Sequence, residues 1–158
     1  MELSYICPER AEEFSAFLRP LWVDTHAPLI NGGREWAEFV FERWGGIDRI
    51  RDDLSKGHFY AYIIIDGKRI GVVSAGAEDE KLIVGRLYIL PEYRGRGIGS
   101  ECLEYILDYG RDRGCRMAEL CVNPKNNNAI ALYSKFGFKE TSRKQNERGY
   151  TSIMTMEL

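Results

Sequence analysis

The hydrophobic residues in the first third of the chain recur at helical spacing. Apolar side chains three and four residues apart predict a helix that begins near Ala11, which Pro20 is expected to break or kink. The same spacing predicts further helices over residues 36–44 and 47–54. Residues 1–57 are therefore expected to be helical.

From residue 59 the pattern changes to that of β-strands. Residues 59–65 are aromatic and β-branched, Asp66-Gly67 is a two-residue hairpin signal, and residues 69–75 form the return strand. The remaining elements are predicted as a strand at 82–90, a helix at 98–113, a strand at 117–122, a helix at 127–135 and strands at 138–144 and 150–158. This order predicts a single domain over residues 1–158 with a mixed sheet, of the α/β or α+β class.

Composition narrows the class of protein. The 158 residues carry 22 basic and 24 acidic side chains, a near-neutral balance that argues against a general nucleic-acid binder. The longest apolar run, residues 59–65, is too short to span a membrane, and the first four residues do not resemble a secretory signal. No pair among the four cysteines forms a C-x-x-C motif, so we expect no metal site. We therefore expect a cytoplasmic protein with no membrane or nucleic-acid partner.

A glycine-rich turn separates the third predicted strand from the helix that follows it. Gly95, Gly97 and Gly99 occupy alternate positions, and the missing Cβ atoms allow the backbone to approach a ligand closely. The free N–H groups at the start of the helix favour an anion, and Arg94 and Arg96 add cationic donors. The segment therefore predicts a pyrophosphate site. Neither a dinucleotide fingerprint nor a P-loop is present.

A second motif lies further along the chain, and the two motifs together resemble those of the GCN5-related N-acetyltransferase (GNAT) superfamily. The family pattern Arg/Gln-x-x-Gly-x-Gly/Ala is met by Arg94, Gly97 and Gly99. The later family pattern is met by Asn126, Ala129, Leu132-Tyr133 and Gly137-Phe138. The resemblance covers residues 59–158.

The resemblance implies a fold and an activity. The GNAT fold has a mixed, mostly antiparallel central sheet that splays open at the cofactor site, with helices on both faces. Residues 1–57 would line the acceptor side, and residues 59–158 would carry the acetyl-CoA motifs. The activity would be transfer of an acetyl group from acetyl-CoA, by direct attack, to a primary amine of a polyamine, another small amine or a peptide. Family members often dimerise, so a homodimer is compatible with the resemblance.

One subgroup of the family resembles this chain in a short segment. Residues 87–93, together with Trp22 and Thr25, are similar to the PaiA-type spermidine/polyamine N-acetyltransferases of bacteria and archaea. Acidic side chains in the helical part, at Asp24, Glu35, Glu38 and Glu42, and in the loop at residues 78–80 would suit a cationic acceptor. The alternative is that these side chains form a solvated surface.

The resemblance also implies roles for individual residues. Pyrophosphate binding would fall to Arg94, Gly95, Arg96, Gly97, Ile98 and Gly99, and pantetheine pairing to the backbone of Leu87, Tyr88 and Ile89. Asn126 would contact the cofactor, and Tyr133 would contact it and act as the general acid. A phenol with a pKa of about 10 is suited to protonate a thiolate whose conjugate pKa is about 8.5.

The general base is less well defined by the sequence. The family's ribosomal-protein N-terminal acetyltransferases have Leu-Glu-Val where this chain has Leu120-Cys121-Val122, so that carboxylate is absent. Glu119, acting through water, and Tyr88 are the candidate bases, and proton release to solvent is the remaining alternative.

Two other functions remain open at this point. The absent carboxylate motivates a non-catalytic acyl-CoA-binding regulatory module, although Tyr133 argues for an enzyme. A nucleic-acid binder would rest on local charge alone, from Arg94, Arg96, Arg111, Arg113 and Arg116.

Overall fold

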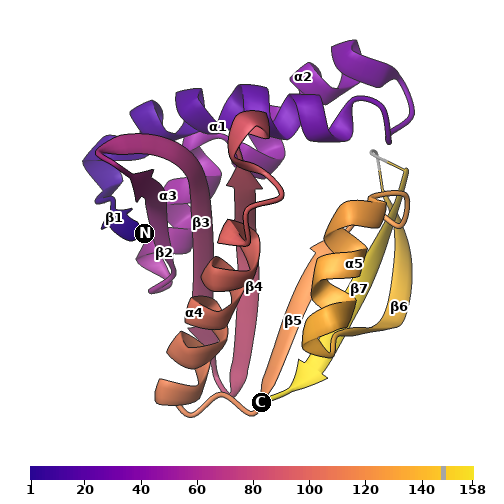
Figure 1. Ribbon diagram of the computed structural model, residues 1–158. Coiled ribbons are helices and arrows are strands. Elements are labelled where there is room, and N and C mark those ends of the chain that lie inside the picture. The colour runs from indigo at the N-terminus through magenta and orange to yellow at the C-terminus, as the bar shows by residue number, and fades with distance from the viewer. Residues whose placement is uncertain (147–148) are drawn as a thin grey trace.

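The fold is built on one sheet of seven strands, counted over the residues that the structure, a computed structural model, describes: 1–146 and 149–158 (Figure 1). The strands are β1 (Glu2–Tyr5), β2 (Phe59–Ile65), β3 (Lys68–Glu78), β4 (Lys81–Ile89), β5 (Met117–Val122), β6 (Lys139–Asn146) and β7 (Gly149–Glu157). Their order is β1-β2-β3-β4-β5-β7-β6, and every neighbouring pair is antiparallel except β4 with β5. The predicted mixed, mostly antiparallel sheet is confirmed.

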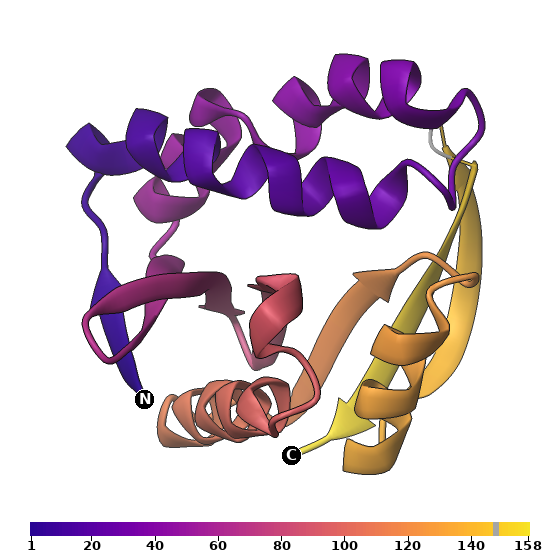
Figure 2. The same cartoon turned by 45° about the horizontal axis from the view of Figure 1, so that its top comes forward.

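Helices cover both faces of this sheet, also as predicted (Figure 2). The first face carries α1 (Ala11–His26), α2 (Gly33–Gly45) and α3 (Ile47–Ser55), and the second carries α4 (Ile98–Asp112) and α5 (Asn127–Phe136). Short 3-10 turns, η1 (Pro8–Arg10) and η2 (Pro91–Tyr93), precede α1 and follow β4.

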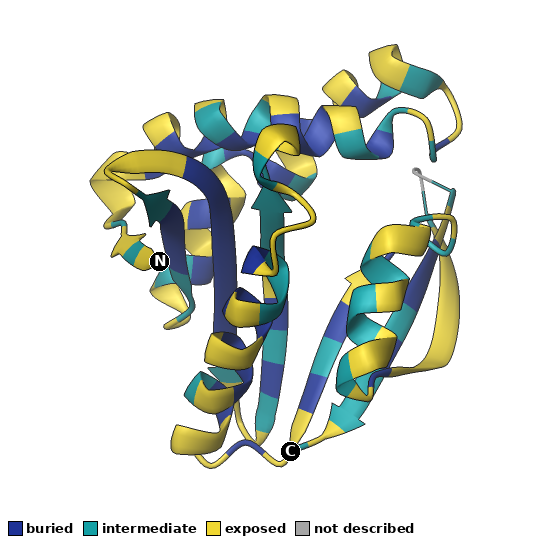
Figure 3. Ribbon diagram, viewed as in Figure 1, coloured by how far each residue is buried: buried dark blue, intermediate teal, exposed yellow. Residues whose placement is uncertain are grey.

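Alternate residues of the central strands belong to two separate hydrophobic cores, one on each face of the sheet. Tyr60 and Tyr62 of β2 pack with Trp22 of α1, whereas Ala61 and Ile63 pack against α4 and its neighbours. This alternation follows from the pleat of a strand, which directs successive side chains to opposite faces. Because both faces are covered, much of β2 and β3 is buried (Figure 3).

The structure corrects the expectation for residues 2–5 and excludes a break of the helix at Pro20. Residues 2–5 are not helical but form the edge strand β1, which pairs antiparallel with β2. Helix α1 also continues through Pro20. Pro20 and Ala16, whose carbonyl loses its helical donor, are both exposed, so water can satisfy that carbonyl.

The parallel pair β4 and β5 is joined over only part of its length. The register runs from Lys81 opposite Met117 to Val84 opposite Leu120 and ends there. Beyond that point the two strands diverge, and an opening separates them (Figure 1). The chemistry-bearing segments lie around this opening.

Candidate active site

A β-bulge in β4 coincides with the point where β4 leaves β5. Val73 pairs with Leu87 and Ala75 with Val84, so Ser74 of β3 faces two residues, Gly85 and Arg86. The Ser74 hydroxyl oxygen accepts the Arg86 backbone N–H at 2.7 Å, and a Cβ on residue 85 would collide with that oxygen. A bulge bends the strand that carries it and re-aims the following side chains.

A cavity of about 170 Å³ lies on the α1–α3 side of this opening. Its ionisable lining groups, tyrosine and cysteine aside, are His26, Arg49, Asp53, His58, Arg86 and Glu119. Tyr88 lines it as well, so both candidate bases from the sequence, Tyr88 and Glu119, border the same space. Glu119 also forms an ion pair with Lys81 at 3.3 Å.

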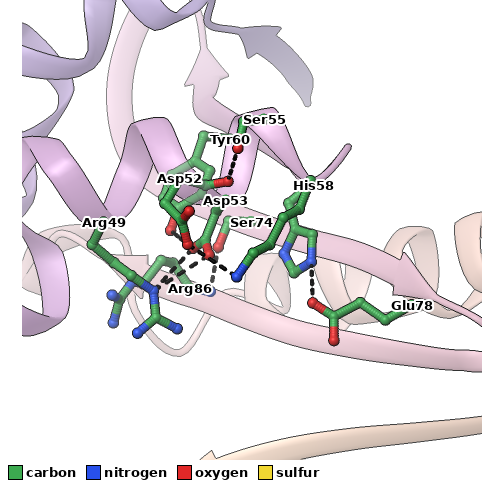
Figure 4. Close-up of polar contacts among 10 residues, drawn as sticks. Arg49, Asp52, Asp53, Ser55, His58, Tyr60, Ser74, Glu78 and Arg86 are labelled. Carbon is green, nitrogen blue, oxygen red and sulfur yellow. Dashed lines mark hydrogen bonds and ion pairs between the residues drawn. The ribbon is translucent and has the colours of Figure 1, made fainter.

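One wall of the cavity holds a buried tyrosine–aspartate pair. The Tyr60 hydroxyl donates to Asp53 at 2.5 Å, and the Arg49 guanidinium lies 3.3 Å from the same carboxylate (Figure 4). Burial raises the pKa of Tyr60 to about 12; the charge of nearby Arg86 opposes this rise, and the hydrogen bond to Asp53 adds to it. The wall therefore combines one buried carboxylate with two guanidinium groups.

A histidine–glutamate pair extends the polar network at the cavity (Figure 4). The His58 Nε2 atom lies 2.9 Å from Glu78. The His58 ring also packs so closely on Gly76 that a Cβ at residue 76 would collide with it. His58 is thereby fixed by packing on one side and by a carboxylate on the other.

The predicted pyrophosphate site lies beyond the end of β4. Gly95 (φ 74°) and Gly97 (φ 80°) adopt the left-handed conformation, and open space surrounds the Cβ position of each. Gly97 caps α4, whose first turn receives no side-chain cap. Arg94 is held in place because its Nε donates to the Ile89 carbonyl at 2.8 Å. Exposed backbone amides at a helix start, with room beside them, fit a phosphate group.

The other residues assigned to the cofactor lie on β4, in the turn before α4 and at the start of α5. We call the glycine-rich turn at residues 94–99 the cradle. Its Ile98 side chain is buried, and the Arg96 guanidinium lies over the Tyr93 ring at 5.1 Å. Leu87 and Ile89 pack into the core on the α4 and α5 side, whereas Tyr88 packs towards the helices of the other face. At Asn126 the side-chain oxygen caps α5 by accepting the Ala129 N–H at 3.3 Å. Asn126 therefore caps a helix, and its contact with the cofactor stays a prediction.

Tyr133 lies on α5 and packs edge-on against Phe138, with ring centroids 5.9 Å apart. Burial raises the pKa of its phenol, and the neighbouring Tyr88 hydroxyl raises it further. Tyr133 is therefore protonated at neutral pH. The same rise makes complete proton transfer to a thiolate less favourable than the ordinary phenol value had indicated.

Several acidic residues expected to suit a cationic acceptor are paired elsewhere. Asp24 bonds Arg34, and Glu38 and Glu42 both bond Arg19. None of these three acids lines the cavity. Conversely, sequence reasoning missed the lining residues Arg49, Asp53 and Arg86, because no local motif marks them.

The described residues contain neither a membrane-spanning helix nor a cluster of metal-binding side chains. In residues 1–146 and 149–158, no helix combines the length and the apolar character needed to cross a membrane. The same part of the chain holds no group of three or more His, Cys, Asp or Glu side chains placed to bind a metal ion.

Comparison with known proteins places the chain in a family. The family model described as "Acetyltransferase (GNAT) family" matches residues 13–138. An uncharacterized N-acetyltransferase of Methanocaldococcus jannaschii is 31% identical over 83 residues, which are 48% of this chain and 37% of that protein. The thialysine N-epsilon-acetyltransferase of Sus scrofa is 37% identical over 54 residues, which are 34% of this chain and 32% of that protein. The match thus spans about a third of the length of these two curated relatives.

A solved structure matches the whole fold. The PaiA N-acetyltransferase of Thermoplasma acidophilum, crystallised in complex with coenzyme A, superposes with a TM-score of 0.79. The two chains are 20% identical, and the match covers 100% of each. At this identity the likeness shows a common fold.

Proposed function

Because the chain belongs to the acetyltransferase (GNAT) family, we propose that it transfers an acetyl group from acetyl-CoA to a primary amine. The acceptor would be a polyamine, another small amine or a peptide amine. The observation that carries the proposal is the opening between β4 and β5, with a glycine-rich turn and open space beyond the end of β4 and a cavity of about 170 Å³ beside it.

The donor would bind through the cradle and the free edge of β4. The uncapped amides at the start of α4 and the side chain of Arg96 would hold the pyrophosphate. Past Val84, β4 has no strand partner on its β5 side within the described ranges. Its backbone groups there are available to pair with the pantetheine arm and to polarise the thioester carbonyl.

The amine would enter from the cavity and attack the thioester directly. An alkylamine with a pKa of about 10.4 is almost entirely protonated at pH 7, so it must lose a proton before it can attack. Glu119, through a water molecule, or Tyr88 would receive that proton, since both line the cavity. As the amide forms, the C–S bond would break, and the protonated phenol of Tyr133 would donate a hydrogen bond to the departing thiolate and stabilise its charge. The second proton of the amine, lost as the amide forms, would go to that thiolate directly or through water.

The proposal is tested by thiol release from acetyl-CoA in the presence of different amines. The panel comprises spermidine, spermine, aminoglycosides, free amino acids, and peptides that present Lys or an N-terminal Ala. We expect turnover with one amine class, with the acetylated amine identified by mass spectrometry. Saturable CoA binding without turnover of any amine would overturn the proposal in favour of a non-catalytic acyl-CoA-binding module.

A further inference from the structure

We infer that the amine acceptor carries a carboxylate, which Arg86 binds with help from Arg49, and that this group sets the acceptor specificity. The inference rests on the proposed transfer to an amine and narrows the class of acceptor. The substrates that fit are amino acids whose reacting amine lies on the side chain, several bonds away from the α-carboxylate.

The first support is the balance of charge in the cavity. Asp53 is already engaged by Tyr60 and Arg49, and its side chain is only 12% exposed. Glu119 is paired with Lys81. Over the described residues, Arg86 forms no ion pair with a carboxylate, although its charge acts on the buried Tyr60 hydroxyl. The cavity therefore presents one guanidinium that an incoming anion can neutralise.

The second support is that the Arg86 and Arg49 guanidinium groups both line the cavity beside Tyr60. Arg86 comes from β4 and Arg49 from α3, and the charge of each acts on the Tyr60 hydroxyl. Figure 4 shows the two side chains extending into the same region. A guanidinium binds a carboxylate through two parallel N–H···O bonds, and a second one nearby strengthens the site. An acceptor with only positive charges would be repelled at this position.

The third support is the spacing along β4. Arg86 and Tyr88 are two residues apart, and both line the cavity. Such residues are separated by roughly 6.6–6.8 Å along a strand. An amine placed at the opening beside Tyr88 would therefore stand several bonds from a carboxylate on Arg86. This is the separation between the side-chain amine and the α-carboxylate of an extended basic amino acid.

Arg86 is also poorly placed to serve the donor. It lines the cavity on the α1–α3 side of β4, whereas the phosphate cradle begins at Arg94, beyond the end of that strand. The carboxylate that it binds would therefore belong to the acceptor.

The test uses amines that differ only in the carboxylate. The first set is lysine, lysinamide and cadaverine, and the second is ornithine, ornithinamide and putrescine, with spermidine added. The kcat/KM of each amine is measured with the full chain, with Arg86→Gln and with the control Arg111→Gln. Arg111 is a surface residue of α4 that pairs with Asp108, outside the cavity. Binding of each amine to the CoA complex is measured by calorimetry in parallel.

We expect the unaltered chain to prefer the acid of at least one set over its amide by about 10-fold or more. Arg86→Gln should lower kcat/KM for that acid by about 10- to 100-fold. The same substitution should change the values for the amide and the diamine less than about threefold, and Arg111→Gln should change none of them. Amides, diamines or spermidine used as well as the acids would overturn the inference. An equal loss for every amine in Arg86→Gln would do the same.

The two proposals fail in different ways. If amines without a carboxylate are acetylated efficiently, the transferase function stands and the inference about Arg86 fails. If no amine is acetylated but the acids bind to the CoA complex and the amides do not, the carboxylate site stands and the transferase function fails. Loss of that binding in Arg86→Gln would then confirm the site.

Discussion

Tyr133 of α5 and Tyr88 of β4 lie close enough that the Tyr88 hydroxyl raises the pKa of Tyr133. In the chain, η2, α4 and β5 lie between β4 and α5, and Tyr88 also lines the cavity. The hydroxyl proposed to stabilise the departing thiolate is therefore electrostatically coupled to one of the two candidate bases.

The proposed base role of Glu119 predicts a change in the pH profile. Glu119→Gln should lower kcat/KM at pH 7 by about 100-fold, within the range of general base catalysis. The deficit should shrink as the pH approaches the amine pKa of about 10.4, because more of the amine is then already neutral. The measurement is kcat/KM between pH 6 and 10 for both proteins.

Lys81→Met is the matched control for that experiment. It removes the ion-pair partner of Glu119 but keeps the carboxylate, so its rate should stay within a few-fold of the original. If Glu119→Gln and the unaltered chain gave parallel pH profiles, Glu119 would not be the base, and Tyr88 or solvent would take the proton.

The cradle predicts a specific loss of donor affinity in Gly97→Ala. Gly97 (φ 80°) and Gly114 (φ 77°) are both left-handed with open space at Cβ, so alanine at either should cost roughly 1–2 kcal/mol of stability. Only Gly97→Ala should weaken CoA binding, because only its Cβ enters the proposed phosphate site. Urea unfolding and calorimetric CoA titration of the two variants separate these effects. Equal CoA affinity in both would argue against the cradle.

Tyr60 predicts a loss of stability at alkaline pH. Its pKa is about 12 in the folded chain and about 10 when unfolded, so the protonated form is favoured by folding. This difference in pKa contributes about 2–3 kcal/mol to the free energy of unfolding, which is present below pH 10 and is lost as the pH rises from 10 to 12. In Tyr60→Phe the free energy of unfolding should be lower at pH 8 and should fall less over that interval. Two curves that fall in parallel would contradict the assignment.

Local sequence patterns were sufficient for the elements whose geometry is set by neighbouring residues. Asp66 (φ 49°) and Gly67 (φ 76°) form the expected hairpin turn between β2 and β3. The glycine-rich turn before α4 could also be predicted, because its left-handed positions, Gly95 and Gly97, favour glycine. Its role in phosphate binding stays a prediction. Helix α4 begins at Ile98, as predicted.

The cavity could not be predicted in the same way, because its residues meet only through the tertiary fold. Arg86 is directed by a bulge that depends on the contact between Ser74 and Gly85, on two different strands. Asp53 reaches the site because α3 packs on the sheet beside Tyr60. No spacing in the sequence marks these contacts. The ion pairs of Asp24, Glu38 and Glu42 could not be predicted either, because their partners Arg19 and Arg34 meet them only in the folded chain.

The central claim is that the chain catalyses acetyl transfer and that the Tyr133 hydroxyl assists the departure of CoA, and Tyr133→Phe tests it most directly. Acetyl transfer to the preferred amine and CoA affinity are measured side by side for the two proteins. We predict that Tyr133→Phe lowers kcat by about 100-fold or more, the scale expected when a hydrogen-bond donor to developing negative charge is lost, while the Kd for CoA changes less than about threefold. Undiminished transfer in Tyr133→Phe, or CoA binding without transfer in the unaltered chain, would contradict the account.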